Sequence, residues 1–171
     1  MNNSKLPLRW VVMGVSGCGK SEVGQRLAAS LGVPFLEGDA YHPAANVDKM
    51  AAGIPLTDED RAGWLGTLRD EIAAARARNE GLVLACSALK RRYRDLLREA
   101  DPDLHFAHLD GARGLIAQRM LARTAHFMPT SLLDSQLADL EPLGPEEQGL
   151  RVDIVKDPAD LAQEILHTQG R

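Results

Sequence analysis

Five short apolar runs alternate along the chain with longer segments in which apolar residues recur every three or four positions. The short runs have the length and composition of β-strands, whereas the three- and four-residue spacing is typical of amphipathic helices. Strands that alternate with helices form βαβ crossovers, which connect parallel strands. The pattern therefore predicts a three-layer α/β fold, in which helices flank a five-stranded parallel sheet with strands at residues 9–13, 34–37, 82–86, 105–109 and 151–155.

The clearest helix is predicted at residues 58–78. Thr57 stands three residues before Asp60, which is the spacing of a helix-capping signal. The apolar stripe of this helix is formed by Leu65, Leu68, Ile72 and Ala75. Further helices are predicted after residue 88, over 112–123 and over 158–167.

The length of 171 residues is typical of one compact domain, and no repeat or linker divides it, so a single domain over residues 1–171 is expected. Two cysteines do not make a disulfide framework, which favours a reducing, cytoplasmic setting. The first nine residues lack the apolar core of a signal peptide, and no apolar run approaches the roughly 20 residues that span a bilayer. We expect a cytoplasmic protein without a membrane partner.

The net charge of −4 argues against a nucleic-acid partner that requires a broadly basic surface. The distribution of the charges is more informative than their sum. Residues 111–133 contain three arginines and no carboxylate, and residues 86–98 contain five basic residues and one acidic residue. Both segments are candidates for binding anions, and the alternative is that they are solvated helix faces.

Residues 14–21, with the sequence GVSGCGKS, match G-x-x-x-x-G-K-[ST] at every fixed position, between the strand predicted at 9–13 and a helical segment at 22–31. In this phosphate-binding loop, or P-loop, glycines let backbone N–H groups surround phosphate oxygens. Lys20 is expected to reach the β- and γ-phosphates, and Ser21 to bind Mg²⁺. We expect a nucleotide to be bound by Gly14, Val15, Ser16, Gly17, Cys18, Gly19, Lys20 and Ser21.

The rest of the chain narrows the class of P-loop protein. It contains no Asn-Lys-x-Asp guanine signature, and the strand at 82–86 lacks the acidic residue of a usual Walker B motif. A carboxylate that helps to hold the metal must therefore come from elsewhere. Glu37, with Asp39 two residues later, follows the second strand and is expected beside the P-loop at the carboxyl edge of the sheet.

The motifs together resemble the gluconate kinases, small sugar-acid kinases with the nucleoside-monophosphate-kinase-like P-loop fold. The chain departs from the family at Ala125, where glycine is usual, and at Leu137, where phenylalanine is common. The resemblance implies transfer of the ATP γ-phosphate to the 6-hydroxyl of D-gluconate, with Mg²⁺, by a homodimer. It extends over nearly the whole chain, through residues 13–21, 37–43, 46, 49–50, 53–61, 64–65, 85–98, 126–129, 132–133 and 135–136.

Phosphoryl transfer requires a group that orients the acceptor hydroxyl, and we expect Asp39 to bind this hydroxyl and accept its proton. Glu37 is expected to support Mg²⁺ through water. This follows from the related shikimate kinases, in which two acids with this spacing have similarly separate roles. The alternative for Asp39 is that it caps a helix beginning near residues 42–43. For His42 a substrate contact and a structural hydrogen bond are both open.

Arg61 is expected to pair with the substrate carboxylate, which suits the planar guanidinium, and the alternative is an exposed helix arginine near Asp58. Ser87 follows a predicted strand, and Lys90 and Arg94 recur at helical i, i+4 spacing. We expect these three side chains to bind gluconate. Among the neighbouring basic residues, solvated side chains are expected at Arg91, Arg92 and Arg98.

Arg119 and Arg123 stand four residues apart in the segment without carboxylates. In the resembling kinases this region is the lid over ATP, here about residues 119–137, while the acceptor-binding segment corresponds to about residues 40–80. Arginines in a lid neutralise charge on the transferred phosphoryl group. The alternative is that both point to water.

Two other functions stay open. One is a kinase of another small polyol acid such as shikimate, although Cys-Ser-Ala-Leu-Lys at residues 86–90 replaces the glycine-rich turn of shikimate kinases. The other is a nucleotide-binding regulatory protein without turnover. Against it argue the intact Lys20, Ser21, Asp39, Arg119 and Arg123.

Overall fold

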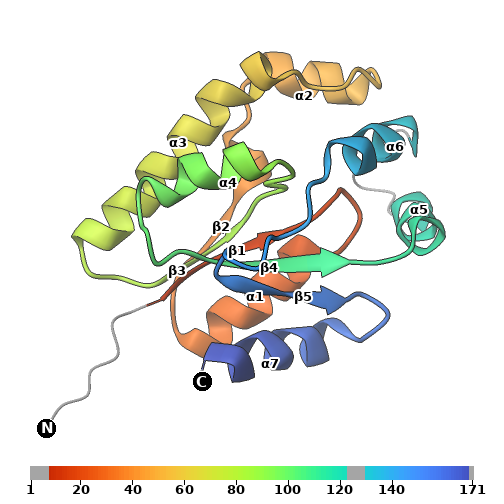
Figure 1. Ribbon diagram of the computed structural model, residues 1–171. Coiled ribbons are helices and arrows are strands. Elements are labelled where there is room, and N and C mark those ends of the chain that lie inside the picture. The colour runs from red at the N-terminus through yellow and green to blue at the C-terminus, as the bar shows by residue number, and fades with distance from the viewer. Residues whose placement is uncertain (1–7, 123–129, 170–171) are drawn as a thin grey trace, which may run out of the picture.

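A computed structural model describes residues 8–122 and 130–169. Its centre is a parallel sheet with the strand order β2-β3-β1-β4-β5, which confirms the α/β fold predicted from the alternation of strands and helices (Figure 1). The strands are β1 (Arg9–Met13), β2 (Phe35–Glu37), β3 (Leu82–Ala85), β4 (His105–Asp110) and β5 (Gly149–Asp153).

Helices cover both faces of the sheet. The helices of the described residues are α1 (Lys20–Leu31), α2 (Ala44–Ala51), α3 (Asp58–Ala77), α4 (Arg91–Arg98), α5 (Arg113–Ala122), α6 (Thr130–Asp139) and α7 (Pro158–Gln169). A short 3-10 helix, η1 (Gly38–Tyr41), follows β2. In Figure 1, α3 and α4 lie on one side of the sheet and α1 and α7 on the other, while α2, α5 and α6 gather beyond the carboxyl ends of the strands.

The alternation of side chains along β1 divides the core into two layers. Trp10 and Val12 pack with residues of α1 and α7, whereas Val11 and Met13 pack with residues of α3 and α4. All five residues of β1 are buried, because a parallel sheet with helices on both faces has no solvated side. The carboxyl edge is therefore the place where loops can form a site.

Locally encoded elements agree closely with the sequence-based predictions. The first strand is confirmed residue for residue, and the long helix ends at Ala77, one residue before the predicted end. The capping box also forms: the Asp60 N–H donates to the Thr57 hydroxyl at 3.1 Å, and the Thr57 N–H donates to the Asp60 carboxylate at 2.9 Å.

A helix beginning near residues 42–43 was considered, which agrees with the start of α2, but its extent was not predicted, and α6 was not predicted at all. The buried residue of α2 is the polar Asn46, while its apolar Val47 is 48% exposed, so the helix has no apolar stripe to detect. In α6 the buried apolar residues are the adjacent Leu132 and Leu133, which do not show helical spacing. Both helices depend on tertiary contacts near the site described below. Among the described helices, none is long and apolar enough to cross a membrane.

Candidate active site

The P-loop joins β1 to α1 at the carboxyl edge of the sheet. Its glycines adopt positive φ angles, including 84° at Gly17, where an added Cβ would lie 2.5 Å from the Met120 Cγ of α5. The loop folds around Lys20, whose Nζ donates to the Val15 carbonyl at 3.0 Å. Lys20 is nearly buried, so its ammonium group is held within the loop before any ligand arrives.

Two acidic residues reach the P-loop although β2 is not next to β1 in the sheet. Gly38 makes this possible, because a Cβ there would lie only 2.3 Å from the Ala85 carbonyl oxygen at the end of β3. Glu37 accepts a hydrogen bond from the Ser21 hydroxyl. The Asp39 side chain is 68% exposed and lines a cavity together with Lys20. It does not cap α2, whose N-cap residue is Pro43.

This cavity, of about 60 Å³, lies between the P-loop, η1, α3, the end of β3 and α6. It brings together residues from distant parts of the sequence. Five of the residues predicted to act on the substrate or in catalysis line it: Lys20, Asp39, His42, Arg61 and Ser87.

His42 makes structural contacts and also lines the cavity. Its ring stacks on Trp64 with centroids 4.0 Å apart, and its Nδ1 lies 3.3 Å from the Asn46 amide nitrogen. The ring also lines the cavity, with Nε2 4.0 Å from an Asp39 carboxylate oxygen. Burial lowers the pKa of His42, an effect that the Asp39 carboxylate opposes, and the net direction is downward.

Arg61 is buried in the cavity wall, so the prediction of an exposed helix arginine is excluded. Its Nη1 donates to the Tyr93 hydroxyl at 2.9 Å and to an Asp139 carboxylate oxygen at 3.3 Å. The Tyr93 hydroxyl donates in turn to Asp58. A guanidinium group is thus fixed at the wall of a cavity that also contains the Lys20 ammonium and the Asp39 carboxylate.

The comparisons with known proteins point to one family. A family model described as an AAA domain matches residues 10–143. Over 156 residues the chain is 50% identical to a gluconokinase of Gluconobacter oxydans, covering 91% of this chain and 88% of the relative. The chain belongs to the gluconokinase family.

Solved structures agree with the gluconokinase assignment. A gluconokinase from Sinorhizobium meliloti 1021 superposes with a TM-score of 0.88 at 47% identity, covering 98% of this chain and 94% of that chain. A sugar kinase from Janibacter gives a TM-score of 0.92 at 45% identity, covering 96% and 95%. The resemblance inferred from the sequence motifs is therefore confirmed.

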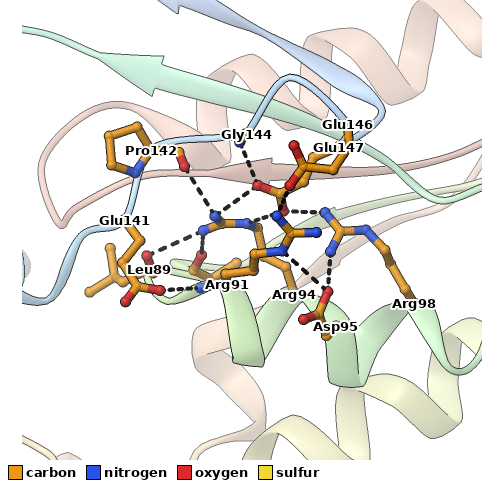
Figure 2. A network of polar contacts seen from close by, with 11 residues as sticks. Leu89, Arg91, Arg94, Asp95, Arg98, Glu141, Pro142, Gly144, Glu146 and Glu147 are labelled. Atoms are coloured by element: carbon orange, nitrogen blue, oxygen red, sulfur yellow. Dashed lines mark hydrogen bonds and ion pairs between the residues drawn. The ribbon is translucent and has the colours of Figure 1, made fainter.

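Within this gluconokinase fold, Arg94 does not face the cavity, and the prediction that it binds substrate is wrong. It is fully buried, and its guanidinium donates to both carboxylate oxygens of Glu147 at 2.7 and 3.1 Å (Figure 2). Its remaining donors are taken by backbone carbonyl groups of Ala88, Leu89 and Pro142. Every guanidinium N–H therefore has a partner inside the protein.

Lys90 is likewise not brought to the cavity lining. It is the N-cap residue of α4 and its backbone is extended, so its side chain does not share a helix face with Arg94, although the Arg94 N–H donates to the Lys90 carbonyl at 3.2 Å. The Lys90 Nζ donates to Asp58 at 3.2 Å. Arg98 also departs from the expected solvated position, since it donates to Glu147 and Asp95 (Figure 2). The side chains of Arg91 and Arg92 are 45% and 61% exposed, as expected, and they form surface ion pairs with Glu146 and Asp58.

The buried pair of Arg94 and Glu147 ties the segment after α6 to α4. Burial raises the pKa of the Glu147 carboxyl, but hydrogen bonds from Arg94, the Gly144 N–H and Arg98 outweigh this effect and lower the pKa to about 2. The same segment is joined to the loop before α4 by the Glu141 N–H, which donates to the Leu89 carbonyl at 2.7 Å. The return from α6 to β5 is thus firmly anchored.

The predicted lid is described in part. Arg119 lies in α5 and donates to the Ile154 carbonyl at 2.7 Å, while Arg123 lies outside the described residues. On α6, Gln136 contacts the P-loop: it accepts from the Ser16 N–H at 2.7 Å and donates to the Ser16 hydroxyl at 3.1 Å. No role was predicted for Gln136, whose only signal in the sequence is its place in a family motif.

Proposed function

We propose that this member of the gluconokinase family transfers the γ-phosphoryl group of ATP to the 6-hydroxyl of D-gluconate, releasing ADP and 6-phospho-D-gluconate. The observation that supports this most directly is the cavity shared by Lys20, Asp39 and Arg61. An ammonium group suits a phosphate, a carboxylate suits a hydroxyl, and a guanidinium suits a carboxylate. The cavity therefore offers complementary groups to both ends of a sugar acid and to the phosphate between the substrates.

The nucleotide is proposed to bind with its phosphates in the P-loop, on residues 14–21. A second hollow of about 450 Å³ lies at the carboxyl ends of β4 and β5, where Asp110, Arg151 and Lys156 line it. Because β1 stands between β3 and β4, the P-loop separates this hollow from the acceptor cavity. The hollow has room for the nucleoside part of ATP, and the two substrates would meet at the P-loop.

Ser21 and Glu37 are the proposed residues for Mg²⁺. A hydroxyl and a carboxylate are hard oxygen donors, which this ion prefers, and the two side chains already contact each other. Within the described residues, no three His, Cys, Asp or Glu side chains form a metal site by themselves. Phosphate oxygens and water would complete the coordination. When bound, Mg²⁺ neutralises charge on the β- and γ-phosphates.

Asp39 is the proposed acceptor of the substrate proton. Its carboxylate faces the cavity and would accept a hydrogen bond from the 6-hydroxyl, then its proton as the new O–P bond forms. Lys20 would stabilise the charge on the transferred phosphoryl group. Arg61 and Ser87 would orient the sugar acid, and His42 would hold Asp39 in position from a distance of 4.0 Å.

The remaining assignments are proposals of the same kind. Arg119 and Arg123 are proposed to neutralise phosphoryl charge from a lid at about residues 119–137, and residues 40–80 to bind the acceptor within one domain. A cytoplasmic location is proposed because two cysteines do not make a disulfide framework. A homodimer is proposed from the family resemblance.

The deciding experiment measures ADP release by the purified protein with ATP, Mg²⁺ and a panel of acids, followed by phosphorus NMR of the product. Turnover with D-gluconate and a primary phosphate ester at its 6-position are the expected results. Faster turnover of shikimate than of D-gluconate would show that the substrate is a polyol acid other than gluconate. ATP binding without turnover of any acid would favour a regulatory protein.

A further inference from the structure

Helix α2 buries a polar residue against α3. Asn46 is 3% exposed, and its amide nitrogen donates to the Asp60 backbone carbonyl at 2.9 Å. The same amide nitrogen lies 3.3 Å from the Nδ1 atom of His42. Burial of an amide costs free energy unless its hydrogen bonds are made inside the protein. Asn46 is therefore held between a fixed backbone carbonyl and the imidazole ring of His42.

The two contacts of Asn46 determine which ring nitrogen of His42 carries the proton. A backbone carbonyl can only accept, so the atom that faces Asp60 is the amide nitrogen and not the amide oxygen. An amide nitrogen can only donate, so the His42 Nδ1 is an acceptor and carries no proton. The neutral imidazole then has its proton on Nε2.

Neighbouring groups hold the His42 ring beside Asp39. The ring stacks on Trp64 with centroids 4.0 Å apart, and the Trp64 indole N–H donates to the Gly38 carbonyl at 2.8 Å. The His42 backbone N–H donates to the Asp39 carbonyl at 3.2 Å, which fixes the turn between the two residues. The His42 Nε2 lies 4.0 Å from an Asp39 carboxylate oxygen, and both residues line the acceptor cavity.

The separation of 4.0 Å is longer than a hydrogen bond, but a rotation of the Asp39 side chain can close it. The His42 side chain is 4% exposed, whereas the Asp39 side chain is 68% exposed and free to turn. Hydrogen bonds between catalytic groups are often long without substrate and shorten when it binds. A bond from the His42 Nε2–H occupies one carboxylate oxygen and leaves the other for a substrate hydroxyl.

The charge state of His42 agrees with this arrangement. The charged groups that face the ring are Asp39 on η1, which raises its pKa, and Arg61 on α3, which lowers its pKa. Burial has the largest effect and also lowers the pKa, so the net direction is downward. A protonated ring would in addition direct an Nδ1 proton at the donor hydrogens of the Asn46 amide. His42 is therefore a neutral donor near pH 7.

We propose that Asn46 is a positioning residue that fixes the tautomer of His42, so that Nε2–H donates to Asp39 and orients its carboxylate toward the acceptor hydroxyl. Asn46 does not line the cavity and acts through His42. A neutral donor lowers the proton affinity of Asp39 less than an imidazolium would. The role of Asp39 rests on the proposed function, whereas the tautomer of His42 follows from the contacts of Asn46 alone.

The first test reads the tautomer by long-range proton–nitrogen NMR of the nitrogen-15-labelled protein, with His42→Gln to assign the signals among the five histidines. Near neutral pH, the wild type should show a neutral His42 ring with its proton on Nε2. In Asn46→Asp the side chain keeps its size, but a carboxylate accepts from Nδ1 where the amide donates. This variant should carry a proton on Nδ1, and its His42 pKa should lie above about 6.5.

The second test measures the kinetics of the same proteins. Asn46→Asp should lower kcat with D-gluconate by at least about fivefold, the effect of one hydrogen bond, while the KM for ATP stays within about twofold. Lys49→Gln is the matched control. It removes another contact between α2 and α3, the ion pair of Lys49 with Asp60 at 2.9 Å, and leaves the Asn46 amide in place, so the Nε2 proton should be kept.

If Asn46→Asp does not fold, Asn46→Ala replaces it, and its His42 ring should show a mixture of both tautomers. A proton on Nδ1 in the wild type would overturn the proposal, as would an Asn46 variant that loses the Nε2 tautomer and keeps full kcat. An equal change of tautomer in Lys49→Gln would also overturn it, because the docking of α2 would then fix the ring. A wild type with the Nε2 proton but without turnover of gluconate would instead refute the proposed function and leave the tautomer assignment standing.

Discussion

The buried ion pair of Arg94 and Glu147 allows a test of whether Arg94 stabilises the fold or binds the substrate. Replacing Glu147 by alanine leaves the Arg94 guanidinium buried, with backbone carbonyl partners but without its paired carboxylate. Removal of one member of a buried pair costs about 3–5 kcal/mol. For a domain of this size, that loss lowers the midpoint of thermal unfolding by about 6–20 °C.

The double variant Arg94→Met/Glu147→Leu removes both charges and replaces them with apolar side chains of similar volume. It should recover at least half of the lost stability, because no uncompensated charge stays buried. The carbonyl groups of Ala88, Leu89 and Pro142 lose their donor, which limits the recovery. Thermal and urea unfolding of the wild type, the single variant and the double variant give the three stabilities.

Kinetics of the same double variant test the placement of Arg94. Since its guanidinium has no contact with the cavity, the KM for gluconate should stay within about twofold of the wild type. A tenfold rise in KM with unchanged kcat and a recovered unfolding midpoint would refute this reasoning. It would mean that Arg94 binds the acceptor in a conformation in which Glu147 has moved away.

The pH dependence of unfolding offers an independent check on the same pair. The pKa of Glu147 is about 2 in the folded protein, below the ordinary value for glutamate of about 4.3 in an unfolded chain. The carboxylate therefore stabilises the fold above about pH 4.3, and this contribution is lost as the pH falls toward 2. The double variant should show a shallower loss of stability than the wild type over this range.

Other variants test the site itself. Asp39→Asn and Lys20→Ala should each lower kcat by at least about a hundredfold with unchanged unfolding midpoints, and a fully active Asp39→Asn would exclude Asp39 as the proton acceptor. Gly38→Ala should cost about 1–3 kcal/mol in urea unfolding, because the new Cβ meets the Ala85 carbonyl oxygen at 2.3 Å, and it should also lower kcat by displacing Asp39. Arg61→Lys should raise the KM for gluconate with little change in the KM for ATP, and equal changes in both would argue against a contact with the acceptor.

The features that could be predicted from sequence are those encoded within a few neighbouring residues. The P-loop motif, the apolar run of β1 and the capping box of Thr57 and Asp60 each depend on contacts between residues close in the chain. The resemblance to gluconate kinases was also recognisable from local features, because the chain contains several short motifs of that family in the same order. Such local patterns decide which segments form strands, helices and a phosphate-binding turn.

The partners of polar side chains depend instead on how these segments pack. Arg94 and Glu147 are 53 residues apart, Arg61 and Asp139 are 78 apart, and Ser16 and Gln136 are 120 apart. A basic residue near a predicted substrate site looks the same in the sequence whether it faces a ligand or a buried carboxylate. By itself, the sequence determined the fold class, the P-loop and the family. Only the tertiary structure decided that Arg94 supports the fold and that Gln136 of α6 contacts the P-loop, because burial and polar pairing exist only after distant segments have packed together.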